Sequence, residues 1–167
     1  PTNDIRRTQF LNNPTNPNHL MPVNKFFAPN RVVFQQNPMV TDYIYMRVEE
    51  FYLLSAEASA ALGAEADAKN RLRQLLTIRL GSQANADAYL NPLTGNALKN
   101  AIYLQHRIEF WGEGKAYLAM KRNKATITRG TNHSFQPGIS IPHNDDRLSP
   151  DIPQSEINNN LAITGQN

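Results

Sequence analysis

The chain has 167 residues, a formal net charge of +3 and no cysteine. That length suits one domain with its own hydrophobic core, and the lack of cysteine excludes disulfides, thiolate metal sites and a cysteine nucleophile. The lysines and arginines are scattered, whereas a nucleic-acid groove needs a dense basic face, so we expect no nucleic-acid partner. No apolar run approaches the ~20 residues that span a bilayer. A polar stretch, not a signal peptide, follows Pro1, so we expect any export or lipidation signal upstream.

Residues 1–44 contain six prolines and eight asparagines. Proline removes backbone donors and asparagine favours turns, so this composition predicts an irregular segment without long helices. The stretch 31–34 is compatible with one short strand. Irregular segments of about 45 residues are uncommon in a compact domain, so we expect this one to wrap a larger body.

A helical pair is predicted next, in a region (45–122) whose only proline is Pro92. The first helix is rich in alanine and should end at Gly63, a natural C-terminal stop. Its apolar residues recur at spacings of three and four and predict this inner stripe: Val48, Phe51, Ser55, Ala58 and Leu62. The second helix fits 64–79, with these residues inside: Ala68, Leu72, Leu75 and Leu76. The very short connection predicts an antiparallel pair.

A third helix is expected over 96–122, after a loop (82–95) that can be helical in part. Its predicted inner stripe is Leu98, Ala101, Leu104, Ile108, Trp111 and Leu118. Gly112 and Gly114 weaken its middle by roughly 1 kcal/mol each relative to alanine, so we expect a kink or a very close helix contact there.

The last segment, 123–167, is again irregular because of its four prolines, with one helical turn after Pro153. The sequence thus predicts a mainly α protein with a helical core (45–122) between two long irregular segments (1–44 and 123–167). The helix pair has the size of one tetratricopeptide (TPR) unit, but no second copy of the period is present, so we predict TPR-like packing rather than a TPR array.

Metal binding is not expected from the four histidines, because none lies at i, i+4 spacing with another and no HExxH motif occurs. They are His19, His106, His133 and His143. The stretch 144–146 (Asn-Asp-Asp) offers oxygen ligands for calcium but lacks the spacing of an EF-hand loop, and a solvated turn is the simpler interpretation.

Catalysis by carboxylates is not expected either. Glu109 and Glu113 lie one turn apart on the same helix, whereas the acid and base of a glycosidase face each other across a cleft. We expect them to be solvated or ion-paired with Arg107, Lys115 or a neighbouring helix. The chain has no GxSxG, P-loop or dinucleotide motif.

Glu57 lies in an apolar run, where a carboxylate is costly to bury unless it is paired. We expect it to pair with Arg107 across the helix packing.

The aromatic residues Tyr103, Phe110 and Tyr117 recur every seven positions and predict one stripe on the third helix. Such a stripe can stack sugars but at this spacing is more typical of helix packing. The single tryptophan, Trp111, is expected in the core.

Three stretches resemble motifs of the SusD/RagB family, in family order: YMRVEEFYLLSAEA (45–58), RIEFWGEG (107–114) and IPQSEINNN (152–160). Further similar positions are Ala68, Leu72, Arg79, Lys121, Arg122 and the closing residues 165–167. The resemblance covers about residues 40–167. It carries over only structural motif residues: Arg47, Glu57, Arg107, Glu109, Glu113 and Glu156.

The resemblance implies the C-terminal portion of a SusD-like outer-membrane lipoprotein, built as a TPR-like α-α superhelix. Such proteins bind oligosaccharides or other nutrients, are anchored by an upstream lipid and cap a SusC-like TonB-dependent transporter. It implies no enzyme activity, catalytic residue, metal or cofactor, and it leaves the glycan-binding residues unknown. Among loop residues, Tyr43, Tyr89 and Phe135 are candidates for contacts with a sugar. The alternative is a TPR-like protein–protein interaction module without its own sugar site.

Overall fold

The computed structural model describes residues 3–13, 16–26, 42, 44–133 and 135–166. The fold is mainly helical, as the sequence predicted. The chain divides into two compact units, Pro1–Ala119 and Met120–Asn167. None of the helices in the described ranges is long and apolar enough to cross a bilayer. The strand expected at 31–34 lies outside the described residues.

The first unit begins with more regular structure than its composition predicts. A 3-10 helix, η1 (Ile5–Gln9), leads into a two-stranded antiparallel ribbon of β1 (Phe10–Asn13) and β2 (Asn16–Pro22). Asp4 starts η1 by accepting a hydrogen bond from the Arg6 amide at 2.9 Å. Both strands of a two-stranded ribbon are edge strands, which tolerate proline, so the proline-rich β2 is compatible with the ladder.

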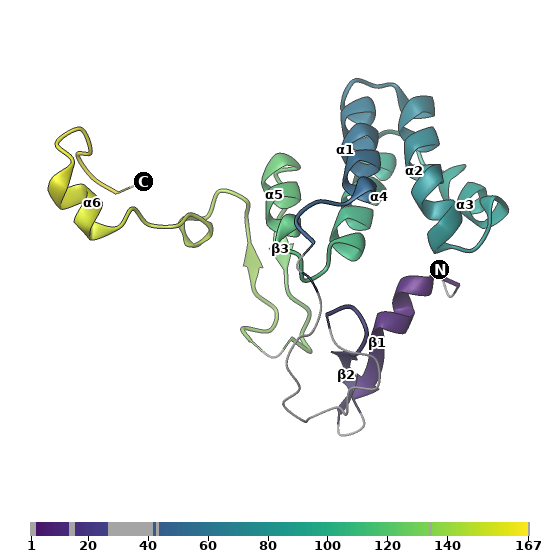
Figure 1. Cartoon of the computed structure of the whole chain (residues 1–167), viewed down its shortest axis with the longest axis horizontal. Helices are drawn as coiled ribbons and strands as arrows, with labels where there is room; N and C mark the ends of the chain where they lie inside the picture. The colour runs from purple at the N-terminus through teal and green to yellow at the C-terminus, as the bar shows by residue number, and fades with distance from the viewer. Residues whose placement is uncertain (1–2, 14–15, 27–41, 43, 134, 167) are drawn as a thin grey trace. The chain divides into compact units, whose positions relative to one another are not determined.

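The helices α1 (Val48–Ala61) and α2 (Glu65–Arg79) form the predicted antiparallel pair (Figure 1). Gly63 ends α1 in the left-handed region, with φ +79°. The amide of Ala64 donates to the carbonyl of Ser59 at 2.9 Å and that of Gly63 to Ala60 at 3.3 Å. This is the Schellman pattern, which satisfies the last carbonyls of the helix and reverses the chain.

The predicted inner face is correct for α2 and wrong for α1. All four residues expected inside α2 are buried. In α1, however, Val48, Phe51 and Leu62 are 62%, 57% and 87% exposed. Ala58 is also exposed and Ser55 is half-buried. The buried residues of α1 lie on the opposite side, and they are Leu53, Ala56 and Ala60.

Two further helices complete the core of the first unit. The expected loop is partly helical as α3 (Gln83–Leu90), which Ser82 caps by accepting the Asn85 amide at 3.2 Å. After it comes α4 (Gly95–Glu109). The core joins residues from all four helices: Leu53, Ala56, Ala60, Ala68, Leu72, Leu75, Leu76, Leu80, Ala86, Leu90, Leu98, Ile102 and Phe110.

The single third helix is a wrong prediction, because a turn at residues 110–114 separates α4 from α5 (Lys115–Arg122). Gly112 and Gly114 both have left-handed φ angles, +77° and +76°. A Cβ atom on Gly112 would lie 2.4 Å from Cε2 of Phe26, so the expected close contact is with Phe26, not with a helix.

The break also corrects the predicted stripe of the third helix. Leu98 and Ala101 are buried, whereas Leu104 and Leu118 are 43% and 56% exposed. Ile108 and Trp111 are half-buried. The buried side of α4 instead includes polar residues: Gln105, His106 and Glu109.

The second unit contains a short antiparallel pair, β3 (Ile127–Thr128) and β4 (Ser140–Ile141). It continues through a 3-10 turn, η2 (Asp146–Leu148), to α6 (Gln154–Asn159). The helical turn predicted after Pro153 is therefore confirmed.

Candidate functional site

A buried carboxylate, Glu109, is the centre of the charged cluster in the first unit. It is 4% exposed and accepts four hydrogen bonds from arginines. Arg47 Nη1 donates at 2.8 Å and Arg6 Nη1 at 3.2 Å. Arg79 donates from Nη2 at 2.7 Å and from Nε at 3.0 Å. The guanidinium groups thus occupy both carboxylate oxygens of Glu109.

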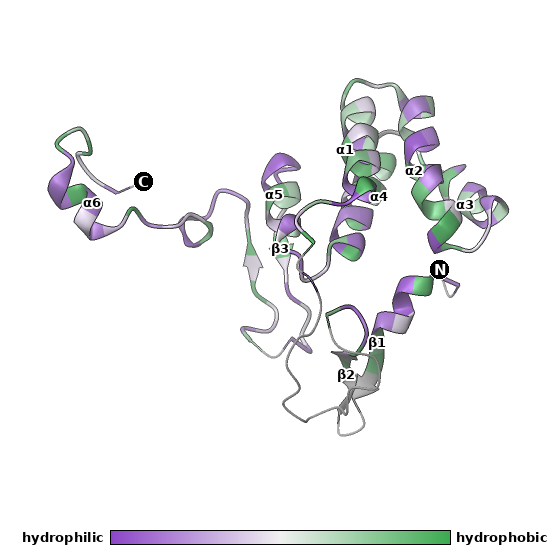
Figure 2. Ribbon diagram, in the orientation of Figure 1, coloured by the Kyte–Doolittle hydropathy of each residue, from purple (hydrophilic) through white to green (hydrophobic). Residues whose placement is uncertain are grey.

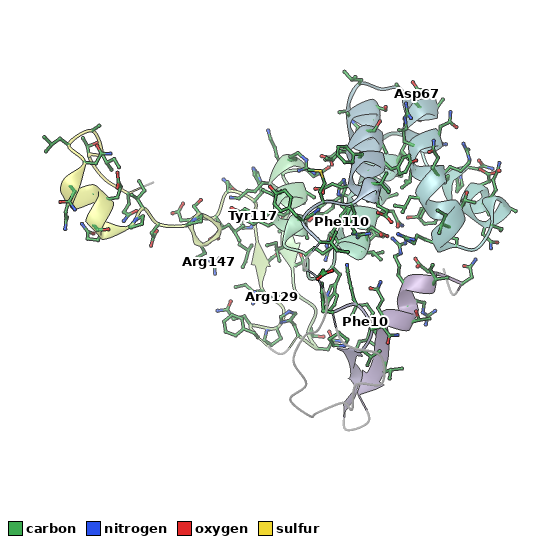
Figure 3. All side chains as sticks on the ribbon, in the orientation of Figure 1. Phe10, Asp67, Phe110, Tyr117, Arg129 and Arg147 are labelled. Carbon is green, nitrogen blue, oxygen red and sulfur yellow. The ribbon has the colours of Figure 1, made fainter. Side chains whose placement is uncertain are left out.

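Four elements bring these groups together. Glu109 ends α4, Arg79 ends α2, Arg47 is the N-cap of α1 and Arg6 belongs to η1. Phe110, labelled in Figure 3, is 1% exposed beside them, and the Arg47 guanidinium lies 4.7 Å from its ring centroid. Helix ends therefore meet around one acid, with an aromatic wall that limits access of water.

The surrounding charges extend this cluster without leaving an excess of either sign. Glu113 accepts from Arg47 at 2.9 Å and Lys25 at 2.6 Å, and Glu49 accepts from Arg79 at 2.8 Å. The cluster has five cations and five anions, and we call it the Glu109 network: Arg6, Lys25, Arg47, Arg79, Lys115, Asp4, Glu49, Glu50, Glu109 and Glu113.

The ionisation of the network is strongly fixed. Burial alone would raise the pKa of Glu109, but hydrogen bonds from Arg79 and Arg47 outweigh it and lower that pKa to about 2. The hydrogen bond to Glu109 raises the pKa of Arg79. Glu109 is therefore a permanent anion at neutral pH and cannot serve as a proton donor.

A cavity of about 390 Å³ adjoins the Glu109 network. Its apolar lining includes Ile5, Phe26 and Ile44. Gln9 also lines it, and its buried Oε1 accepts no hydrogen bond from any residue that the structure describes. The carboxylate oxygens of Glu109 and Glu113 that line it are already occupied by cations, and the cavity is also lined by Asp42 and the amide of Gln9.

The predicted interpretation of Glu109 and Glu113 as ion-paired residues is confirmed, with partners that the sequence did not identify. Neither pairs with Arg107 or Lys115 among the described contacts. Arg107 is exposed, with its guanidinium 5.8 Å from the Tyr103 ring, and Lys115 contacts Glu50.

The pair expected between Glu57 and Arg107 is also wrong. Glu57 Oε2 lies 3.2 Å from Nε2 of His106, the residue before Arg107. The distance fits an ion pair, but the geometry does not meet that of a hydrogen bond for Nε2. His106 is 3% exposed and lies on the buried side of α4, whereas Arg107 lies on the outside.

The other histidines and acids form no metal cluster among the described residues. His133 Nδ1 contacts the Phe135 backbone, and the His143 carbonyl accepts from Lys121 at 2.7 Å. The His19 side chain is outside the described part. Asp145 pairs with Arg147 at 2.7 Å and starts η2, which agrees with a turn.

The aromatic candidates have different environments. Tyr89 lies in α3 and not in a loop, half-buried against the core, and its hydroxyl accepts from Gln105 Nε2 at 3.4 Å. Phe135 is 63% exposed, and Tyr43 lies outside the described residues. Trp111 is half-buried and edge-on to Phe10, which Figure 3 labels, with the ring centroids 4.8 Å apart.

The expected aromatic stripe does not form, because its members lie on separate elements. Tyr103 is in α4, Phe110 is in the turn and Tyr117 is in α5. Sequence reasoning also missed Arg6 and Lys25, which belong to the Glu109 network, and Gln105, whose Oε1 accepts from Arg6 at 2.7 Å. Arg6 lies 103 positions from Glu109, and no local spacing links two residues so distant.

One comparison identifies relatives of the chain. No curated protein and no solved structure matches it. The family model described as SusD family matches residues 8–167. Members of this family bind glycans for nutrient uptake, are binding proteins rather than enzymes, and are in general outer-membrane surface lipoproteins. The match spans nearly the whole sequence, and the chain belongs to the SusD family.

Proposed function

We propose that this chain is the C-terminal portion of a SusD-like protein that binds oligosaccharides at the outer-membrane surface. An upstream lipid holds the protein to the membrane, and the bound sugar passes to a SusC-like TonB-dependent transporter. The observation that carries this proposal is the family match over residues 8–167. The motifs around Arg47 and Glu109 support it, because they form the network that joins the helices.

The geometry favours binding over catalysis. A glycosidase needs one carboxylic acid that can donate a proton and a second carboxylate across a cleft. Cations hold both Glu109 and Glu113, and the pKa of Glu109, about 2, is far below that of a proton donor working near neutral pH.

Calorimetry of the full-length protein against a panel of oligosaccharides tests this proposal. We expect saturable binding of at least one glycan and no turnover of chromogenic glycosides under the same conditions. Absence of binding across a broad panel would contradict the proposal, and turnover would contradict the noncatalytic part of it.

A second candidate function is a protein–protein interaction module, and the outer face of α1 favours it. Val48, Phe51 and Leu62 leave an apolar stripe exposed, and helices that are apolar on both sides are typical of interiors or interfaces. A pull-down of the transporter separates the two functions. Asp67→Ser is the control, because Asp67 is exposed on α2 (Figure 3). The module is favoured if Phe51→Ser abolishes capture of the transporter, Asp67→Ser does not, and the protein binds no sugar.

A further inference from the structure

The stretch between Glu113 and Asp145 contains basic residues and no acidic ones. These 31 intervening residues contain no aspartate or glutamate, although the basic residues of the whole chain are scattered. They contain five cations: Lys115, Lys121, Arg122, Lys124 and Arg129. The loop between β3 and β4 lies in this stretch, within the second unit.

Hydrogen bonds across its base and interior hold the β3–β4 loop in shape. The Arg129 amide donates to the Ile139 carbonyl at 3.0 Å, and the Gly138 amide donates to Gly130 at 3.3 Å. The Arg129 side chain donates from Nη1 to the Phe135 carbonyl at 3.0 Å. His133 Nδ1 accepts from the Phe135 amide at 3.1 Å. An arginine side chain and the backbone thus fix the position of one aromatic residue.

The exposed ring of Phe135 lies beside the half-buried side chain of Arg129. The ring of Phe135 is 63% exposed, and the Arg129 guanidinium lies 5.1 Å from its centroid, within range of a cation–π contact. Among the residues that the structure describes, no carboxylate pairs with Arg129. The cations of the Glu109 network are balanced by internal acids, whereas Arg129, which is held by the Phe135 carbonyl, meets no anionic partner within the described part of the chain.

We propose that the β3–β4 loop is a subsite for acidic glycans, those with carboxylate or sulfate groups. This inference rests on the proposed glycan-binding function. The C–H face of a sugar ring stacks on the exposed ring of Phe135, because its weakly positive hydrogens match the negative face of the aromatic. The guanidinium of Arg129 receives the carboxylate or sulfate, because two oxygens of either group can accept hydrogen bonds from neighbouring N–H groups of the guanidinium. The absence of acids on either side of the loop avoids repulsion of such a ligand.

Calorimetry on the full-length protein tests the subsite with charged and neutral forms of the same sugar. The probes are oligogalacturonate and chondroitin sulfate fragments, with methyl-esterified oligogalacturonate and desulfated chondroitin as neutral counterparts. We expect one acidic probe to bind at least about tenfold more tightly than its neutral form, with affinity that falls as NaCl screens the contact.

Three variants locate that binding. Phe135→Ala should weaken the acidic probe about tenfold, as truncation of an aromatic hot spot does. Arg129→Gln should remove most of the preference for the acidic form. Arg147→Gln is the matched control, because it removes an exposed arginine of the same unit that pairs with Asp145. It should change affinity by less than about twofold, and all three variants should melt like the parent protein.

The outcomes are distinct. Preference for an acidic probe that depends on Phe135 and Arg129 supports the subsite. Binding of neutral glycans alone, or acidic binding that Arg147→Gln weakens as much as Arg129→Gln does, overturns the subsite and leaves the proposed function intact. Failure to bind any acidic or neutral glycan overturns both.

Discussion

Both helices of the antiparallel pair bury apolar residues in the core, but they differ in what their other faces carry. In α2, four apolar residues are buried, whereas charged residues such as Asp67 and Arg71, and the apolar Ile78, are exposed. In α1, the apolar stripe through Phe51 is exposed, while Glu49 and Glu57 lie toward the packed side at 24% and 20% exposure. In Figure 2, green covers much of α1, whereas the first turns of α2 are purple.

Ion pairing explains the difference. The acids of α1 face cations on other elements: Glu49 meets Arg79, and Glu50 meets Lys115. Leaving the network's partly buried cations without these acids would cost several kcal/mol, which is of the same order as leaving the large apolar residues of the stripe exposed at about 1.5–3 kcal/mol each. The orientation of α1 satisfies the charges and still buries three small or aliphatic residues. A charge network can therefore select the inner face of a helix against its apolar periodicity.

Removing the charge of Glu109 should cause the largest loss of stability. Glu109→Gln keeps the shape of the side chain but leaves the guanidiniums of Arg47 and Arg79 facing a neutral amide. We expect a loss of about 3–5 kcal/mol in the free energy of unfolding, which lowers the melting temperature by roughly 10 °C for a chain of this size. Differential scanning calorimetry measures it.

Asp145→Asn is the control for this variant, because it removes a carboxylate whose partner Arg147 is 57% exposed. Solvent screens such pairs, so we expect a much smaller change in melting temperature. Equal losses in the two variants would show that the network does not stabilise the fold.

Acid should weaken the network gradually. The pKa of Glu109 is about 2 in the folded chain, against an ordinary value of 4.5. A depressed folded-state pKa gives stability that is fully present above pH 4.5 and is lost as the pH falls toward 2. For Glu109 the loss amounts to about 3 kcal/mol. Urea unfolding at a series of pH values measures it, and Glu109→Gln should have a shallower dependence between pH 4.5 and 2. An unchanged dependence would contradict this assignment.

The turn that places Glu109 and Glu113 offers a third, smaller test. Gly112→Ala combines a left-handed φ of +77° with a Cβ atom 2.4 Å from Phe26, and we expect a loss of about 2–3 kcal/mol. Gly114→Ala has nearly the same φ, +76°, but no atom within 4 Å of the added Cβ, and should lose only about 1 kcal/mol. Chemical denaturation compares them, and equal losses would mean that Phe26 yields without cost.

Local features of the sequence were enough to predict part of the fold. Gly63 and the α2 stripe predicted the helix pair because caps and 3.6-residue periodicity are local properties. The third helix was predicted too long, because apolar spacing continues through Gly112 even though its φ ends the helix. A single glycine in a helical pattern costs only about 1 kcal/mol, which does not distinguish a kink from a break.

The charged site was predicted only in outline. Motif spacing singled out Arg47, Glu109 and Glu113, and the structure joins them. Arg6 and Lys25 come from the proline-rich start of the chain and meet these acids through tertiary packing alone. Whether Arg107 or His106 faces Glu57 depends on how α4 is rotated about its axis. Consecutive helix residues point in different directions, so the local sequence did not determine which of the two is the partner.

The two faces of α1 give the smallest and most direct test. Phe51 is 57% exposed, so Phe51→Ala should change the free energy of unfolding by no more than about 0.5 kcal/mol. Leu53→Ala, two positions away and fully buried, should cost about 2–5 kcal/mol through the cavity it leaves. Urea titrations of both variants measure the difference. A large loss for Phe51→Ala in this isolated chain would mean that the apolar stripe is the inner face after all, and that ion pairing does not orient α1. Phe51→Ala can also cost little in this chain and yet destabilise the full-length protein. In that case a part of the protein outside these residues covers the apolar stripe, and the charge network determines that this face of α1 is the one left for that part to cover.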